Sequence, residues 1–250
     1  MTSEEVRVLA WCHREEVAAV AGSAVLVLPV GATEQHGPAL PLGTDSALVD
    51  AVLGRALASY AGPAPVVVAP TVTYGNSQHH LFACAGSVRP ATLLALYGDL
   101  VDSFVTSGFR RIFVLNGHGG NDECARLAVK EAALRHRPLL AAACSYWTLA
   151  DREPDVPGHA GAFEASLLLA ARPDLLADPP PAAEPAFTGA YATEPAPGVT
   201  LARAGDWATT GGFTDDPAGA TAAGGERRLA TIGSRLAAVL AGFAATPLEG

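Results

Sequence analysis

The feature that most constrains the fold is a set of four short runs that are apolar through most of their length. They are AVLVLPV (24–30), PVVVAPTV (65–72), RRIFVLN (110–116) and PLLAAACSYW (138–147). Continuous rather than alternating hydrophobicity predicts parallel strands that are covered on both faces. Segments with helical spacing follow or precede these runs, at 46–61, 91–109 and 121–136. The alternation predicts an α/β fold, a three-layer α/β/α sandwich with a mostly parallel central sheet.

The C-terminal part of the chain is predicted to complete the same domain. Residues 162–176 have the pattern of a helix. Residues 174–225 are rich in Pro, Ala and Gly, which predicts long loops around the domain. The Pro-rich piece at 178–186 can be interpreted as a linker, but the chain beyond it is too short for an independent core. A final helix at 226–245 is expected to pack back on the sheet, so residues 1–250 are predicted to form one domain.

The composition excludes several classes of partner. The 250 residues carry a formal net charge of −9 without a basic stripe, so we expect neither nucleic acid nor an anionic membrane surface as a partner. No apolar run has the length of a membrane span, and the start, MTSEEVRVLAW, lacks a signal-peptide pattern. The four cysteines form no CxxC pair, which favours buried free thiols over a disulfide framework or a zinc ribbon. We therefore expect a cytoplasmic location.

The loop after the first run, GATEQHGPALPLGTD (31–45), carries two carboxylates and an imidazole. Glu34 and His36 come just past the strand, and residues two apart in an extended chain point the same way. Asp45 stands at the start of the next helix, where an N-cap is the alternative role. Because ligands of α/β proteins collect at the carboxyl ends of strands, these three side chains are candidate metal ligands.

The third run leads into a second candidate segment, LNGHGGNDE (115–123). Gly117, Gly119 and Gly120 allow a tight turn and a close approach of the backbone. They place His118 at the carboxyl end of a strand, as Glu34 and His36 are placed. The alternative is a glycine-rich phosphate loop, but the pattern is neither GxGxxG after a strand nor GxxxxGK followed by Ser or Thr.

Two further segments carry histidines. In GHAGAFEAS (158–166), His159 precedes a helix and Glu164 lies near its first full turn. The alternatives are a turn residue and a charge that favours the helix N-terminus. In YGNSQHHLFACAGS (74–87), His79 and His80 are adjacent and would face opposite ways in an extended segment, so at most one is expected to enter a site. Taken together, these clusters favour one functional centre in a chain with only seven His.

The chain resembles the creatininase (creatinine amidohydrolase) family, metal-dependent enzymes that cleave C–N bonds of cyclic or linear amides. The resemblance rests on PVGATEQHGPALPLGTD, NGHGGN and HAGAFEAS, in that order, and is best over residues 20–170. TDDPAGAT (214–221) corresponds to a GDP-x-x-AT signature near the family's C-terminus. The resemblance implies a creatininase-like fold and a homo-oligomer, usually a hexamer built from dimers. Apolar loops at 174–213, poorly covered in a monomer, agree with an oligomer.

The resemblance also implies two divalent metal ions per chain, of Zn, Mn or Fe, since His and carboxylate ligands suit all three. Four residues match the family's metal ligands, with Asp45 in the place of the bridging carboxylate: Glu34, His36, Asp45 and His118. In creatininase a further Glu ligand comes two residues after the His that matches His118, where this chain has Gly120. Glu164 is the best local replacement, so we expect it to be both a metal ligand and a catalytic residue.

His159 and Glu164 match the family's later His and Glu, near the substrate. His159 is expected to donate a proton to the leaving nitrogen, because an imidazole titrates near neutrality. The predicted substrate contacts are His80, Trp147, Gly119 and Gly120. Many relatives carry FPGT after the His of the fourth segment, where this chain has ACAGS. The aromatic residues that flank creatinine have no clear counterparts, and Trp147 and Trp207 are the candidates to line a pocket.

The predicted function is hydrolysis of the C–N bond of a small-molecule amide by a metal-activated water. A formamide, a lactam or a cyclic guanidine is a compatible substrate. Two alternatives remain open at this point. One is a peptidase that trims a short, modified peptide, and the other is a non-catalytic family member that binds metal. The glycine at position 120 is the only support for the non-catalytic alternative.

Overall fold

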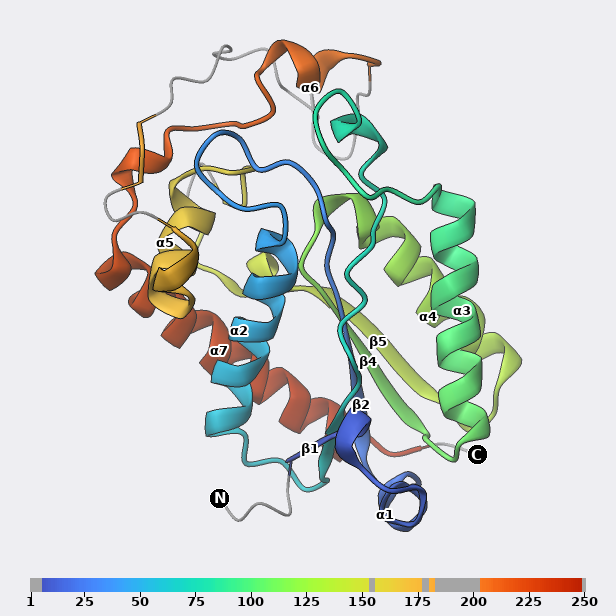
Figure 1. Ribbon diagram of the computed structural model, residues 1–250. Helices are drawn as coiled ribbons and strands as arrows, with labels where there is room; N and C mark the ends of the chain where they lie inside the picture. The colour runs from blue at the N-terminus through green and yellow to red at the C-terminus, as the bar shows by residue number, and fades with distance from the viewer. Residues whose placement is uncertain (1–5, 153–155, 177–179, 183–202, 249–250) are drawn as a thin grey trace.

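Parallel strands form the centre of the molecule. The computed structural model describes residues 6–152, 156–176, 180–182 and 203–248. In these residues five strands form one sheet in the order β1-β3-β2-β4-β5, and every neighbouring pair is parallel. The strands are β1 (Val6–Val8), β2 (Val25–Val30), β3 (Val66–Val68), β4 (Arg111–Asn116) and β5 (Leu140–Ser145). Helices lie on both sides, so the predicted three-layer α/β/α sandwich is confirmed (Figure 1).

The helices cover both faces because alternate strand residues point to opposite sides. Val25 and Val27 pack in an apolar cluster with α2, α5 and α7, and Leu26 and Leu28 in a second cluster with α3 and α4. All six residues of β2 are buried, as its continuous apolar pattern predicts. The long helices are α2 (Thr44–Ser59), α3 (Pro90–Thr106), α4 (Asp122–Arg135), α5 (Ala162–Ala171) and α7 (Ala222–Ala245).

Shorter elements complete the described part of the chain. The α-helices among them are α1 (Arg14–Val20) and α6 (Asp206–Thr209). The 3-10 helices are η1 (Leu9–Trp11), η2 (Gln78–His80), η3 (Gly119–Asn121), η4 (Tyr146–Leu149), η5 (Pro173–Leu175) and η6 (Pro217–Gly219).

Helix α7 is a core helix of unusual length. Its N-cap Thr221 accepts a hydrogen bond from the amide of Gly224, and Leu229, Ile232 and Leu236 are buried. By length and by a mean hydropathy of 1.2, this helix alone among the described residues could cross a membrane. That corrects the expectation that no segment has such a length, but α7 packs on α2 and α5 within the core.

Two features differ from expectation, and a third expectation falls largely outside the described residues. Strand β1 and helix α1 were not predicted, because a three-residue strand such as VRV is too short to show a period. The free cysteines are not fully buried, and Cys84 is exposed, because its loop runs over the surface. Much of the predicted loop region 174–225, and most of the linker candidate at 178–186, lies outside the described residues.

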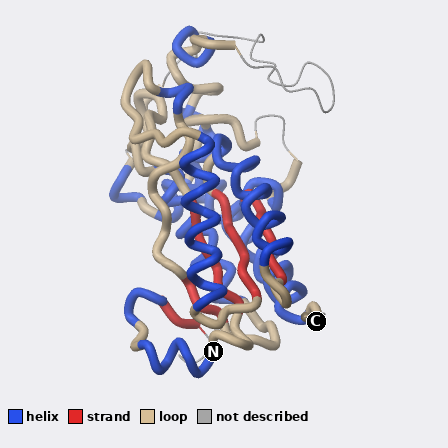
Figure 2. The backbone as a smooth tube through the Cα atoms, turned by 90° about the vertical axis from the view of Figure 1, so that its right-hand side faces the viewer, coloured by secondary structure: helices blue, strands red, loops and turns tan. Residues whose placement is uncertain are grey.

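The path of the chain across the sheet changes direction between β2 and β4. Strand β2 connects through α2 to β3 on one side, whereas β4 connects through α4 to β5 on the other. Loops that follow the two strands diverge at such a point, and ligands of α/β proteins bind there. Figure 2 shows loops gathered above the upper ends of the strands. The topology therefore brings the loop with Glu34 and His36 next to the loop with His118.

Candidate metal centre

The loop after β2 places two ligating side chains next to each other. Glu34 and His36 are fully buried. Nδ1 of His36 lies 3.1 Å from the carbonyl oxygen of Glu34. A carbonyl oxygen only accepts, so Nδ1 donates and Nε2 keeps its lone pair. That Nε2 points to Asp45, whose Oδ1 lies 3.2 Å away.

Asp45 lies between two imidazoles in the first turn of α2. Gly43 takes the N-cap position, so the alternative role of Asp45 as the N-cap is wrong. Oδ1 of Asp45 faces His36, and Oδ2 lies 3.2 Å from Nδ1 of His118. Gly117 permits this approach, because a Cβ there would lie 2.8 Å from the carbonyl oxygen of Asp45. The two carboxylate oxygens thus face different ligands.

His118 is held by the backbone and by Asn116. Its amide donates to Oδ1 of Asn116 over 3.1 Å, and Nδ2 of Asn116 donates to its carbonyl over 2.8 Å. Nε2 of His118 lies 2.9 Å from the carbonyl oxygen of Asn76, so Nε2 donates and Nδ1 keeps its lone pair. A Cβ at Gly120 would overlap that same carbonyl oxygen. A side chain at position 120, such as the Glu of creatininase, therefore has no room on this backbone.

Helix α5 brings Glu164 to the other side of Asp45. Oε2 of Glu164 lies 3.9 Å from Nε2 of His36 and accepts a hydrogen bond from the amide of Ala160 over 2.6 Å. Ala160 has a φ of 58°, in the left-handed region that L-residues rarely adopt. Asp215 accepts from the amide of Ala162 over 2.8 Å and so fixes the start of the helix. Glu164 therefore lies near His36 and also accepts a hydrogen bond at the N-terminal end of its own helix.

Two groups of three residues share Asp45. Glu34, Asp45 and His118, here called the strand-edge triad, offer ligand atoms within 4.8 Å of one another. His36, Asp45 and Glu164, here called the helix triad, do the same. The predicted ligands Glu34, His36, Asp45, His118 and Glu164 are therefore brought together.

The donor set of the two triads fits a cation. Nε2 of His36 and Nδ1 of His118 each direct a lone pair at a carboxylate oxygen of Asp45. These lone pairs repel each other unless a proton or a metal ion lies between the atoms. Both carboxylate oxygens of Glu34 and Oδ2 of Asp45 are buried without a hydrogen-bond partner in the described part of the chain. Buried carboxylate oxygens are costly without a partner, and imidazole and carboxylate together are the ligands of divalent transition metals.

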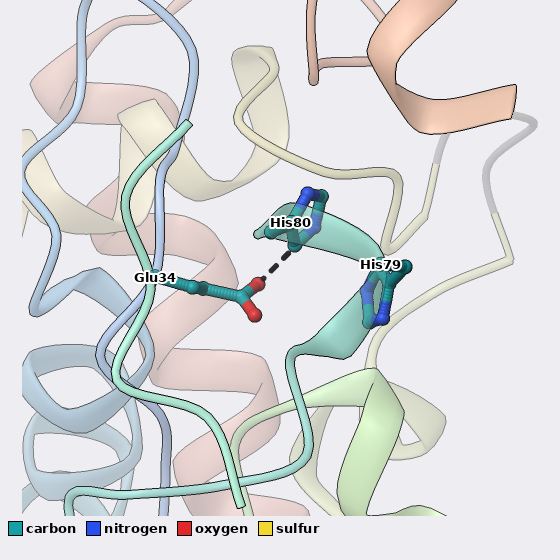
Figure 3. Close-up of side chains that lie close together, drawn as sticks. All are labelled: Glu34, His79 and His80. Atoms are coloured by element: carbon teal, nitrogen blue, oxygen red, sulfur yellow. Dashed lines mark ion pairs between the residues drawn. The ribbon is translucent and has the colours of Figure 1, made fainter. Parts of the chain in front are cut away.

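Histidines of η2 border the carboxylate of Glu34. Figure 3 shows Glu34 pointing at His80, whose Nε2 lies 3.5 Å from Oε1 of Glu34. His79 belongs with them to another triad whose ligand atoms lie within 4.8 Å. At most one of the adjacent pair was expected to face the site, but a 3-10 turn rather than an extended segment carries them, so both rings lie near Glu34.

The predicted substrate contacts lie in different surroundings. Trp207 of α6, rather than Trp147, contacts the histidines: its ring centroid lies 4.7 Å from that of His80 and 5.3 Å from that of His159. Trp147 packs against the core beside Tyr146, and no contact described for it reaches the cluster. Gly119 is exposed, with open space where a Cβ would be.

The electrostatics of the cluster centre on Asp45. Burial alone would raise its pKa, but His36 and His118 hold the pKa of this carboxyl well below its usual range. Burial opposes the charged form of both imidazoles, yet Asp45 raises the pKa of His36 to about 10 and that of His118 to about 9. Burial raises the pKa of Glu34 and of Glu164 to about 7. The buried carboxylates thus require positive charge, from protons or from a metal.

The imidazoles of His80 and His159 behave in the opposite way. Burial and the neighbouring His36 and His80 hold the pKa of His159 well below its ordinary value. Burial and His79 lower the pKa of His80. These lowered pKa values favour the neutral form of both rings. Nδ1 of His159 lies 3.7 Å from Oε1 of Glu34, so a neutral imidazole borders the cluster there.

Sequence reasoning missed two residues that shape the site. Gln35 was not singled out, since a residue between Glu34 and His36 would face away from both in an extended chain, whereas its side chain lies between His80 and His159. Asn76 acts through its carbonyl oxygen, which any residue could supply, so no side-chain pattern could have revealed it. For Gln35 the available signal was its position inside the motif EQH.

The chain is similar to known proteins through most of its length. The profile of the creatininase family, described as creatinine amidohydrolase, matches residues 10–240. The chain is 38% identical over 156 residues to the mycofactocin precursor peptide peptidase of Mycolicibacterium smegmatis, over 60% of this chain and 59% of that protein. It is 33% identical over 218 residues to the creatinine amidohydrolase of Pseudomonas putida, over 74% of this chain and 81% of that protein.

Solved structures show the same fold. A crystal structure of creatinine amidohydrolase (creatininase) superposes with a TM-score of 0.76 at 27% identity, over 96% of this chain and 98% of the other. A creatininase described as the Mn form superposes with a TM-score of 0.77 at 28% identity, over 96% and 99%. The match with the peptide peptidase, in contrast, spans only 59% of that relative's length.

Proposed function

The chain belongs to the creatininase family, and we propose that it is a metal-dependent amidohydrolase that cleaves a C–N bond of a small cyclic or linear amide. The observation that carries this proposal is the position of Asp45, common to two triads of ligating side chains. The family's other members named above include a creatinine amidohydrolase, which supports the reaction type.

We propose that two divalent ions bind, one at the strand-edge triad and one at the helix triad. Zn, Mn and Fe are all compatible with the ligands. When bound, such ions polarise a carbonyl oxygen and lower the pKa of water. Glu164 takes the place of the ligand that Gly120 lacks, since it lies 3.9 Å from Nε2 of His36 on the far side of Asp45. This arrangement disfavours the non-catalytic alternative.

His159 is the proposed proton carrier. Its lowered pKa keeps the imidazole neutral, and Nδ1 faces Glu34 at the border of the cluster. Nδ1 can accept a proton from the attacking water and then deliver it to the leaving nitrogen, which releases an acid and an amine. The buried carboxylate of Glu34 lies 3.7 Å from Nδ1 of His159, and Trp207 packs its ring against that of His159.

A second candidate function is peptide trimming. Its support is the 38% identity to a mycofactocin precursor peptide peptidase, which exceeds the 33% identity to creatinine amidohydrolase. Hydrolysis of a peptide bond uses the same ligands and the same proton carrier. Substrate size is therefore what separates the two candidates.

The test is a substrate panel with defined metal content. The full chain is stripped with a chelator, reloaded with Zn²⁺ or Mn²⁺, and assayed on creatinine, a lactam, a formamide and short peptides. We expect metal-dependent turnover of a small amide. Turnover of peptides alone would favour the second candidate, and no stoichiometric transition metal after reloading would refute the proposed centre.

We also propose that residues 1–250 act as a single cytoplasmic domain that assembles into a homo-oligomer, with a hexamer as the family-like form. Large apolar side chains on the described surface support assembly, since Trp11 is 84% exposed and Leu134 is 78% exposed. Sedimentation across a wide concentration range tests this directly, and a single-chain mass throughout would contradict it.

A further inference from the structure

Gln35 lies between the two neutral imidazoles that border Glu34. We infer that Gln35 holds His80 and His159 both in the Nε2–H tautomer, so that His80 presents an N–H toward Glu34 and His159 presents a lone pair. Gln35 is thus a positioning residue that acts through the two histidines. Its catalytic importance rests on the proposed amidohydrolase function, whereas the tautomers themselves can be observed without substrate.

The orientation of the Gln35 amide is fixed by two backbone groups. The amide of Gly37 donates to Oε1 of Gln35 over 2.9 Å. Nε2 of Gln35 donates to the carbonyl oxygen of Gly212 over 2.7 Å. A backbone N–H can only donate and a carbonyl can only accept, so oxygen and nitrogen of the side-chain amide cannot exchange places.

The amide nitrogen determines the tautomer of His80. One hydrogen of Nε2 is used by Gly212, which leaves Nδ1 of His80 at 2.8 Å and Nε2 of His159 at 3.2 Å for the second. Nε2 of His159 donates to the carbonyl oxygen of Gln35 and cannot accept, so the second hydrogen is directed to Nδ1 of His80. Nδ1 therefore accepts, and in a neutral imidazole the hydrogen must then be on Nε2. That Nε2 is buried, has no hydrogen-bond partner in the described residues, and faces Oε1 of Glu34 at 3.5 Å (Figure 3).

This tautomer gives the triad of Glu34, His79 and His80 a different meaning. Distances alone make the three residues a candidate metal site. A ligating nitrogen must offer a lone pair, however, and Nε2 of His80 carries a hydrogen. His80 is therefore a hydrogen-bond donor to Glu34 or to a substrate oxygen, rather than a ligand.

The backbone of Gln35 determines the tautomer of His159. Nε2 of His159 lies 3.0 Å from the carbonyl oxygen of Gln35, so Nε2 donates and Nδ1 keeps its lone pair. Nδ1 lies 3.7 Å from Oε1 of Glu34. The rings of His80 and His159 stack at 4.4 Å with 19° between their planes. Gln35 thus orients two rings so that an N–H of His80 and a lone pair of His159 both face Oε1 of Glu34.

Gly212 keeps the amide of Gln35 in this position. It has a φ of 85°, and a Cβ there would lie 2.5 Å from Oε1 of Gln35. The carbonyl oxygen of Gly212 accepts one of the two amide hydrogens of Gln35, which leaves the other for His80. The segment 205–214, whose Trp207 also contacts His80, therefore influences the tautomer of His80.

The test reads the tautomers directly. Two-bond ¹⁵N–¹H correlation spectra of the full, histidine-labelled chain, metal-free and with Zn²⁺ added, distinguish Nδ1–H from Nε2–H. Single His80→Asn and His159→Asn variants assign the signals. In the unmodified chain we expect both rings protonated at Nε2. Since His80 meets Glu34 through Nε2 and His159 through Nδ1, the two rings then face Glu34 in opposite states. Nδ1–H on either ring would overturn the inference without needing a folded variant.

Gln35→Glu separates the roles of side chain and backbone. A carboxylate only accepts, so His80 should gain a hydrogen at Nδ1, whereas His159, which is held by the unchanged backbone carbonyl, should keep its tautomer. Gln78→Glu is the matched control, because Gln78 is exposed on the same 3-10 helix as His80 and should change neither ring. An unchanged His80 signal in folded Gln35→Glu protein would overturn the assignment.

Activity provides a separate readout. If the amidohydrolase function holds, Gln35→Glu should lower kcat at least about tenfold with a smaller change in KM, since general acid–base contributions are about 10²–10⁴. An inactive wild-type chain with the expected tautomers would refute the proposed function and leave the role of Gln35 intact. An active chain with other tautomers would refute this inference alone.

Discussion

The strand-edge triad and the helix triad share Asp45 but are held in different ways. Glu34 and His118 follow neighbouring strands, and their loops are fixed by contacts at the sheet edge, such as the carbonyl of Asn76 on His118. Glu164 belongs to a helix whose start is fixed by Asp215, which accepts a hydrogen bond from the amide of Ala162, 53 residues earlier in the sequence. The first triad depends on sheet topology, whereas the second depends on a distant loop.

This difference separates what the pairing of neighbouring strands secures from what a loop distant in the sequence must supply. In the strand-edge triad, the parallel pairing of β2 and β4 brings Glu34 and His118 together, and Gly117 leaves room for Asp45. The helix triad also needs Ala160 in a left-handed conformation, with its amide bound to Glu164. We therefore expect changes at Asp45 to affect both triads and changes elsewhere to affect one.

Asp45→Asn should have the largest effect, because it removes the carboxylate that both triads share. Loss of groups that only support a metal ligand typically costs 10–100-fold, so we expect turnover to fall by more than about 10²-fold and metal content to fall at both sites. Elemental analysis and a turnover assay on one preparation measure this. Asp50→Asn is the control, since Asp50 is exposed on the same helix. Normal metal content in Asp45→Asn would contradict the shared position.

Glu164→Gln should affect the helix triad alone. A neutral amide oxygen binds a divalent ion less well than a carboxylate, so one of two ions should be weakened and most turnover lost. If Glu164 only favours the helix N-terminus, the change should instead cost about 0.3–1 kcal/mol of stability and leave the metal in place. Metal stoichiometry combined with thermal unfolding distinguishes the two results.

His159→Asn is the contrast to Glu164→Gln. Because its proposed role is proton transfer, the variant should retain both ions yet lose turnover. Loss of an ion with His159→Asn would instead favour the triad of Glu34, His36 and His159 as a metal site.

Gly120→Ala should disturb the strand-edge triad. The added Cβ would overlap the carbonyl of Asn76, which orients His118. Overpacking of this kind typically costs about 1–3 kcal/mol, and we expect that loss in chemical unfolding, with weaker metal binding. Gly119→Ala has open space and should leave stability unchanged within about 0.5 kcal/mol. Equal stability of the two variants would show that the loop simply shifts.

The sequence predicted the parts of this molecule that depend on local pattern. The buried strands, the crossover helices and the ligands at strand ends follow from hydrophobic runs and from the rule that sites lie at carboxyl ends. The edge strand β1 was missed because three residues carry no period. The matches of Glu164 and His159 came from family resemblance, because no local pattern brings α5 to β2.

The contacts that orient the site could not be predicted from the sequence. Asn76 acts through a backbone carbonyl, and the turn of Gln35 toward His80 reverses the alternation of an extended chain. The position of Trp207 near the histidines depends on a long connection after α5. Trp147 was the predicted substrate contact and Trp207 a further candidate to line a pocket, and packing places Trp207 rather than Trp147 at the histidines.

The smallest expected effect concerns the backbone that supports the helix triad. Ala160 and Ala165 are both buried, so replacing either with Gly removes the same buried methyl group. Ala160 has a φ of 58°, where an L-residue costs about 1–2 kcal/mol relative to Gly. Ala165 lies inside α5, where Gly instead costs about 0.5–1 kcal/mol.

We expect Ala160→Gly to remain close to the wild-type free energy of unfolding, and Ala165→Gly to be less stable by about 1–2 kcal/mol. In a chain of this size that difference is several degrees in Tm, with metal content as a second readout. If Ala160→Gly were the less stable of the two, the left-handed conformation at the start of α5 would be wrong, and the hydrogen bond that holds Glu164 would have to be reassigned.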